Sequence, residues 1–136
     1  MAASAFNMYN NSKRYLTDGT IDLDTDTIIC SLYKNDSNAS TFTLSVSTEL
    51  TNPVSTGGHS VQTLVIAYND TGLSTLVSAD ALVFTASGAD MTSIQFLVVR
   101  ENNGKLICWC ELSTANFNVT DGNTLTVTFG GLFSMQ

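Results

Sequence analysis

The side chains best suited to chemistry are three cysteines, Cys30, Cys108 and Cys110, and a single histidine, His59. A cysteine beside a histidine can act as an activated nucleophile, and these four side chains could also supply the N and S ligands of a zinc site. Cys108 and Cys110, however, lie in the apolar run from Leu106 to Leu112, where a cysteine is most often a buried packing residue. His59 lies in a glycine-rich turn without a partner nearby in the sequence. We therefore predict no catalytic residue and no zinc ligand, and we expect that the chain is not an enzyme.

A second candidate is the acidic run Asp22, Asp24 and Asp26, whose spacing matches the first half of a calcium-binding loop. An EF-hand loop then needs a glycine directly after the third ligand and a glutamate at the twelfth position. The sequence has Thr27 and Tyr33 at these two places. The run is therefore expected to be a solvated segment that leads into the first strand, and we predict neither a bound metal nor a cofactor.

Composition and charge limit the classes of partner. The 136 residues carry a formal net charge of −7 and only five Lys and Arg, so a basic stripe that follows nucleic-acid phosphates is not expected. No apolar run approaches the length of a membrane span, and no secretory leader is recognisable, so we expect synthesis and folding in a cytosol. The odd number of cysteines then favours reduced thiols over a disulfide framework.

A short helix is predicted over residues 4–16, because long side chains recur there at three- and four-residue steps: Phe6, Tyr9, Lys13 and Leu16. Ser4 can cap its start, and Gly19 lies just past its end. The apolar stripe of this helix is thin, so the helix must dock on the sheet or on a neighbouring subunit. These four residues are therefore the candidate interface, and a β domain without residues 1–16 is expected to remain soluble.

After Gly19 the hydrophobic period changes from helical to two, which is typical of strands. Strands are predicted at residues 28–33, 42–47, 61–68, 73–77, 81–85, 92–100, 106–112, 124–129 and 132–135. Asn103-Gly104 predicts a type I′ hairpin between two of them, since both central positions of that turn need positive φ. We expect a single domain over 1–136, with an N-terminal arm and helix in 1–19 and an antiparallel, jelly-roll-like β-sandwich in 20–136.

The run from Tyr15 to Ile28, which contains Asp-Gly-Thr-Ile-Asp-Leu-Asp-Thr-Asp-Thr, resembles the opening of a family of tailed-bacteriophage virion proteins. In that family a helix with a Tyr-Asn-Asn-like triplet leads into this acidic segment and then into a strand. Three later segments resemble the family in the same order: Thr85 to Thr92 followed by Phe96 to Asn102, then Leu106 to Leu112, and then Gly122 to Phe129. Together the similar segments cover about half of the chain.

The resemblance implies a structural role in the virion, with capsid decoration or cementing as the first choice. Such a protein binds the outer face of the assembled shell, commonly as a homotrimer, and clamps neighbouring subunits of the major capsid protein. It is made in the host cytoplasm and resides on the capsid surface. Two alternatives stay open: a tail or fibre-associated structural subunit, and a carbohydrate-binding β-sandwich module.

Overall fold

The computed structural model describes residues 1–3 and 5–135, and its fold is mainly β with antiparallel sheets and a short helix, which confirms the predicted fold class. The helical segments are α1 (Ser12–Thr17) and the 3-10 helix η1 (Ser47–Glu49). The strands are β1 (Asn7–Met8), β2 (Ile28–Lys34), β3 (Gln62–Thr63), β4 (Ile66–Thr71), β5 (Ser74–Ala79), β6 (Leu82–Thr85), β7 (Met91–Glu101), β8 (Leu106–Glu111), β9 (Phe117–Val119), β10 (Thr124–Val127) and β11 (Phe133–Met135).

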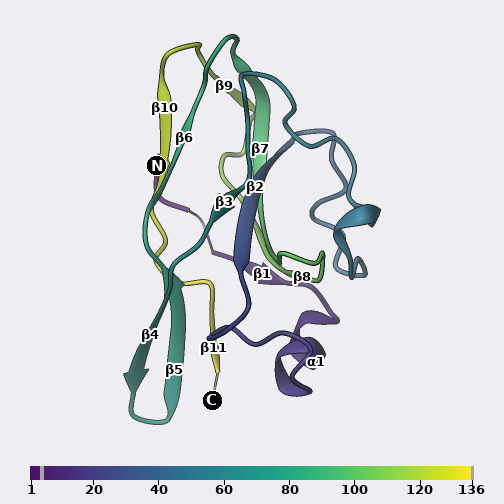
Figure 1. The fold of residues 1–136 in the computed structure, drawn as a ribbon, viewed down its shortest axis with the longest axis vertical. Coiled ribbons are helices and arrows are strands. Elements are labelled where there is room, and N and C mark those ends of the chain that lie inside the picture. Colours follow the sequence, from purple (N-terminus) through teal and green to yellow (C-terminus); the bar gives the residue numbers. More distant parts are fainter. Residues whose placement is uncertain (4, 136) are drawn as a thin grey trace.

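The described strands form one large sheet and two small ones. The large sheet has the order β1-β8-β7-β2-β3, with β9 also paired to β7, and the small sheets are β6-β10 and β4-β5-β11. Figure 1 shows the two small sheets on the same side of the large one, as a second layer. The β4-β5 hairpin extends past the end of the large sheet, near the C-terminus. The arrangement is sandwich-like, and residues from both layers share a main core.

Strand β7 is buried on both faces, which explains its continuous apolar run Phe96-Leu97-Val98-Val99. Leu97 and Val99 pack into the main core between the layers. Phe96 and Val98 alternate with them and point to the other face of the sheet, as successive strand residues do. There they join a second cluster that the loop after β2 covers, whose buried members are Tyr9, Tyr33, Ala39, Leu44, Phe96, Val98 and Leu106.

The N-terminal helix prediction was wrong in its extent. The helix covers only Ser12–Thr17, and the preceding residues run as an extended segment that includes β1. The backbone there bonds to distant strands instead of to a helical turn: Ala3 N donates to Thr128 O at 2.9 Å, and Tyr9 N donates to Ile107 O at 3.1 Å. The predicted cap, Ser4, lies outside the described residues. Gly19 has φ +81 just past the end of the helix, as the sequence predicted.

The strand predicted at residues 42–47 is also absent, although most of the others are found. Phe42 O accepts from Asn10 N at 2.9 Å, and the Glu49 carboxylate accepts from Ser45 N at 2.9 Å and from Val46 N at 3.0 Å. This segment is a loop over the second cluster, in which Leu44 is buried. Its alternating apolar pattern reflects packing of the loop on the sheet below.

Three further details differ from the sequence interpretation. The single strand expected at 61–68 is divided into β3 and β4, because the chain leaves the large sheet near Leu64 and joins a small one at Ile66. The hairpin between β7 and β8 is present, but Asn103 does not have positive φ, whereas Gly104 has φ +112. The turn is therefore not type I′. Strand β9 was not predicted.

Candidate functional site

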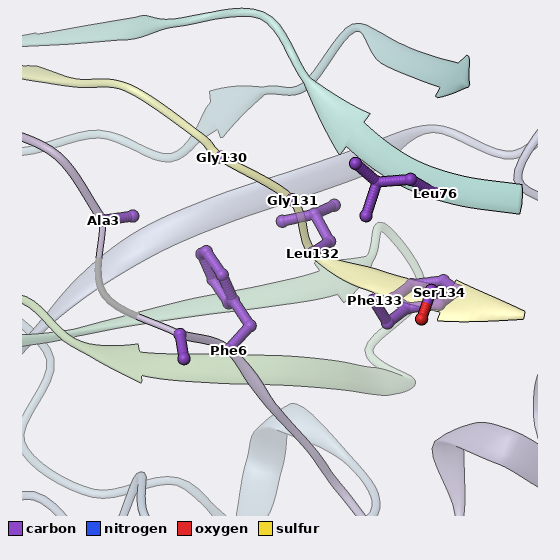
Figure 2. A pocket seen from close by; sticks show the side chains of 9 residues that line it. Ala3, Phe6, Leu76, Gly130, Gly131, Leu132, Phe133 and Ser134 are labelled. Atoms are coloured by element: carbon purple, nitrogen blue, oxygen red, sulfur yellow. The ribbon is translucent and has the colours of Figure 1, made fainter. Parts of the chain in front are cut away.

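Three pockets lie in a row along the C-terminal strand β11, and together we call them the β11 groove. The first has a volume of about 350 Å³ and lies between the N-terminal segment and β5. Figure 2 shows Phe6, Leu76 and Phe133 around it, with Gly130 and Gly131 forming the chain that leads into β11. Its walls are mainly apolar, so the first pocket is suited to contact with apolar groups.

The second pocket, about 210 Å³, lies between α1 and β11 and is lined by Met8, Lys13, Leu16, Thr17, Phe133, Ser134 and Met135. Leu16 and Met135 also line the third pocket, of about 280 Å³, so the second and third are neighbours. Phe133 and Ser134 connect the second pocket to the first in the same way. The groove therefore runs from the N-terminal segment, past α1, to the acidic turn that contains Asp22, Asp24 and Asp26.

The structure brings three of the four predicted interface residues to this groove. Phe6 lines the first pocket, and Lys13 and Leu16 line the second. Tyr9 is different: its side chain is completely buried in the second cluster and donates a 2.6 Å hydrogen bond to Ala39 O. Tyr9 thus belongs to the interior of its own fold and offers no surface to a partner.

The third pocket combines apolar walls with acidic residues. Leu16, Ile21, Leu23, Tyr68 and Met135 supply its apolar contacts, and Asp22 and Asp24 lie beside them. This pocket lies under the inner face of the β4-β5-β11 sheet, because Tyr68 and Met135 share the face that carries buried Val77. Burial and then the nearby Asp24 and Asp22 carboxylates raise the pKa of the Tyr68 phenol.

Asp22 and Asp26 fix the conformation of the acidic turn from within. Asp22 Oδ1 accepts a hydrogen bond from Asp24 N at 3.0 Å, and Asp26 Oδ2 accepts one from Asp22 N at 2.8 Å. The backbone bond from Asp24, followed by the contacts with Thr25, lowers the pKa of the Asp22 carboxyl. Within residues 1–3 and 5–135, no group of three or more Cys, His, Asp or Glu side chains is arranged to hold a metal ion.

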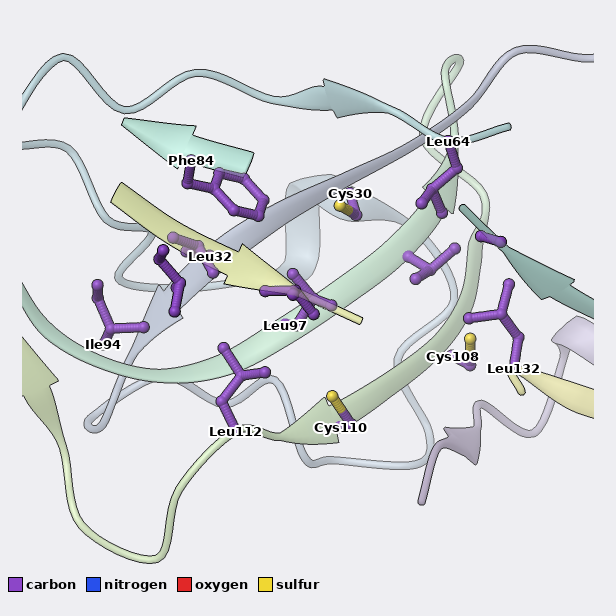
Figure 3. Packing of buried hydrophobic residues seen from close by; sticks show 14 of the residues in the cluster. Cys30, Leu32, Leu64, Phe84, Ile94, Leu97, Cys108, Cys110, Leu112 and Leu132 are labelled. Atoms are coloured by element: carbon purple, nitrogen blue, oxygen red, sulfur yellow. The ribbon is translucent and has the colours of Figure 1, made fainter. Parts of the chain in front are cut away.

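The three cysteines lie inside the fold and not at its surface. Figure 3 shows Cys30, Cys108 and Cys110 among the apolar side chains of the main core. Burial, with a smaller contribution from Cys110, raises the pKa of Cys30 to about 12. Burial likewise raises the pKa of Cys108 well above its usual value. Because the thiolate is the nucleophilic form, these environments disfavour cysteine chemistry.

His59 lies between β2 and β6. Its Nε2 accepts a 3.3 Å hydrogen bond from Leu32 N, and its ring centroid lies 5.6 Å from that of Phe84. Burial lowers the pKa of the imidazole. The neutral ring therefore acts as a packed hydrogen-bond acceptor that supports β2.

Sequence reasoning missed Tyr68, Leu23 and Met135 as members of the candidate site. The available signal was the short apolar alternation of Phe133 and Met135 in the last predicted strand, which indicates one apolar face. Nothing in the spacing connects that face to Tyr68 or to the acidic turn, since only the sheet β4-β5-β11 brings them together.

Comparisons with known protein families, characterised proteins and solved structures found no match to this chain. None of the helical segments in the described part of the chain has the length and apolar character needed to cross a bilayer.

Proposed function

We propose that this chain is a structural protein of a tailed-bacteriophage virion, a decoration or cement protein that binds the outer face of the capsid. The observation that carries the proposal is the β11 groove, an open and largely apolar surface built from both ends of the chain. The sequence resemblance described above supplies the class of assembly. On this proposal the protein acts as a homotrimer that binds the major capsid protein.

The proposed mechanism is binding linkage. A ligand that binds the closed lattice but not the dissociated subunits stabilises the lattice by RT ln(1 + [L]/Kd), which is about 2.7 kcal/mol per site at a hundredfold excess over Kd. Such a role requires a rigid domain with an exposed contact surface, and it requires no catalytic activity. The two packed clusters of this fold supply the rigidity, and the groove supplies the surface.

The carbohydrate-binding alternative has less support from the structure. Sugar sites of that kind need flat aromatic rings exposed on one surface. Here the exposed aromatic side chains in the described residues are Phe42 and Tyr68. Phe42 packs edge-on against Trp109 on the outer face of the large sheet, whereas Tyr68 lies on the inner face of the β4-β5-β11 sheet, in the third pocket.

The test is co-sedimentation of the purified full chain with capsid shells that lack this protein. We expect saturable binding, and shells that dissociate at a higher temperature once they are loaded. Met135→Asp, in the groove, should weaken binding at least tenfold, because it places a charge in a contact that becomes desolvated. The matched control is Val83→Asp, since Val83 is a similarly exposed strand residue that does not line the groove.

Absence of binding to shells would overturn the proposal. Equal binding by the Met135→Asp and Val83→Asp variants would show that the β11 groove is not the contact surface. Binding to purified tails in place of shells would assign the protein to the tail.

A further inference from the structure

Strand β4 forms an open edge of the β4-β5-β11 sheet. The order β11-β5-β4 leaves the outer side of β4 without a partner in the described part of the chain. Asp80 N donates to Val65 O at 3.1 Å, which identifies Val65 and Asp80 as a hydrogen-bonded pair. Such pairs alternate along an antiparallel ladder, so Ile66, Tyr68 and Asp70 direct their N–H and C=O groups away from β5.

This edge also lacks the usual features that prevent strand addition. Natural edges are commonly protected by Lys, by Pro or by a bulge, and β4 (Ile66–Thr71) has none of these. Exposed apolar side chains are concentrated beside it: Val65 is 61% exposed, Tyr68 50% and Leu73, in the hairpin turn, 95%. The Asp70 carboxylate accepts a 2.6 Å hydrogen bond from the Thr75 hydroxyl on the neighbouring strand and so does not shield the free edge.

The acidic and apolar side chains next to the free edge of β4 indicate which kind of side chain a partner strand would carry. Tyr68 lies on β4 and also lines the third pocket, where Asp22 and Asp24 accompany the apolar walls. A side chain that enters this pocket from an added strand would pass the Tyr68 ring and end near Leu23 and the two carboxylates. Arg and Lys have this combination of an apolar stem and a cationic end, and Arg can also stack on the Tyr68 ring.

A second copy of the chain fits the same edge poorly. Each copy carries a net charge of −7, and pairing of β4 with itself would bring two sets of Asp22, Asp24 and Asp70 together. Like charges at close range disfavour that contact.

We propose that the free edge of β4 and the acidic third pocket together bind an extended, arginine- or lysine-bearing segment of another protein by strand addition. Main-chain hydrogen bonds to Ile66, Tyr68 and Asp70 supply affinity, and the acidic pocket selects the basic side chain. The inference rests on the proposed function for the source of the segment, which is a subunit of the capsid shell.

The probe is the peptide acetyl-Thr-Arg-Val-Arg-Val-Thr-amide, titrated into the full ¹⁵N-labelled chain and followed by NMR. We expect saturable shifts at Leu23 and Tyr68, and slower amide exchange at Ile66 and Asp70. A matched peptide with citrulline in place of arginine, which keeps the shape but removes the charge, should bind at least about threefold more weakly. Asp24→Asn should have a similar effect, whereas the control Asp36→Asn, at an exposed aspartate outside the pocket, should not.

Two variants of one residue separate strand addition from side-chain contact. Tyr68→Ser and Tyr68→Pro both remove the phenol, but only proline removes the outward N–H, and an edge position tolerates proline. We expect the proline variant to bind about tenfold more weakly than the serine variant, with matching circular dichroism spectra as the check on folding. Equal binding by these two variants, equal binding of the two peptides, or no saturable binding would overturn the inference.

Self-association of the chain through β4, abolished by Tyr68→Pro, would also overturn it in favour of a second copy as the occupant. The two proposals can fail separately. Peptide binding by a protein that does not bind shells would contradict only the virion role, and equal shell binding by the Ser and Pro variants would contradict only strand addition.

Discussion

The phenol of Tyr9 donates a 2.6 Å hydrogen bond to the carbonyl oxygen of Ala39, and both residues are completely shielded from solvent. The bond connects the N-terminal segment to the loop that covers the outer face of the large sheet. Burial raises the pKa of Tyr9 far above its usual value, so the phenol remains a protonated donor at every physiological pH. The N-terminal segment is therefore held in the fold by a contact that its own sequence pattern does not reveal.

Tyr9→Phe should lower the free energy of unfolding by about 1–3 kcal/mol, because the buried Ala39 carbonyl loses its donor while the ring is kept. Urea denaturation followed by circular dichroism measures the change. Tyr68→Phe is the control, since Tyr68 is half exposed and should change stability by less than about 0.5 kcal/mol. Equal effects of the two substitutions would show that the Tyr9 bond contributes nothing specific.

Deletion of residues 1–16 should produce an aggregating or unfolded chain. It removes Tyr9 from the second cluster, together with the pairing of β1 with β8, so that apolar surface and a strand edge become exposed. Gel filtration and circular dichroism of the truncated protein measure this. A soluble, cooperatively folded monomer would instead support the sequence-based expectation of a detachable arm.

Gly57 and Gly72 form a matched pair for a steric prediction. Both have positive φ, +67 and +68, but a Cβ at Gly57 would lie 2.7 Å from Met91 N, whereas one at Gly72 meets nothing within 4 Å. Gly72→Ala should lower the free energy of unfolding by about 1–2 kcal/mol, because of the backbone conformation alone. Gly57→Ala should lower it by about 1–3 kcal/mol more than that, because the added Cβ clashes with Met91. Thermal denaturation of the two variants measures the difference. Equal losses of stability would contradict the close packing of Gly57 on Met91.

His59 should make the fold less stable in mild acid. Its folded-state pKa is lowered by burial, so below the unfolded value of about 6.5 the unfolded chain binds the proton more readily. The stability contribution is complete above that value and is lost as the pH falls toward the folded pKa. The melting temperature should therefore drop more between pH 7.5 and 5.5 for the wild type than for His59→Gln, whose amide oxygen can still accept from Leu32 N. Parallel curves would contradict this assignment.

The strands β7 and β8 and their hairpin could be predicted because their signals are local. Leu97 and Val99 alternate with Phe96 and Val98, and Gly104 marks the turn between the two strands. Each signal acts over a few residues. The sequence therefore contains nearly all the information needed to place these two strands.

The N-terminal segment could not be predicted in the same way. Its three- and four-residue spacing suits a helix, but Asn7 pairs with Trp109, and such distant partners leave no trace in local periodicity. The β11 groove could not be predicted for the same reason. Leu16, Tyr68 and Met135 meet only because the β4-β5 hairpin and β11 form one sheet above the acidic turn.

The proposed virion role is tested most directly by quantitative mass spectrometry of virions purified from the natural source of this sequence and separated into capsids and tails. We predict that the full chain is found with the capsids, in a fixed ratio to the major capsid protein. Its absence from virions, or recovery only in trace amounts, would contradict the central claim.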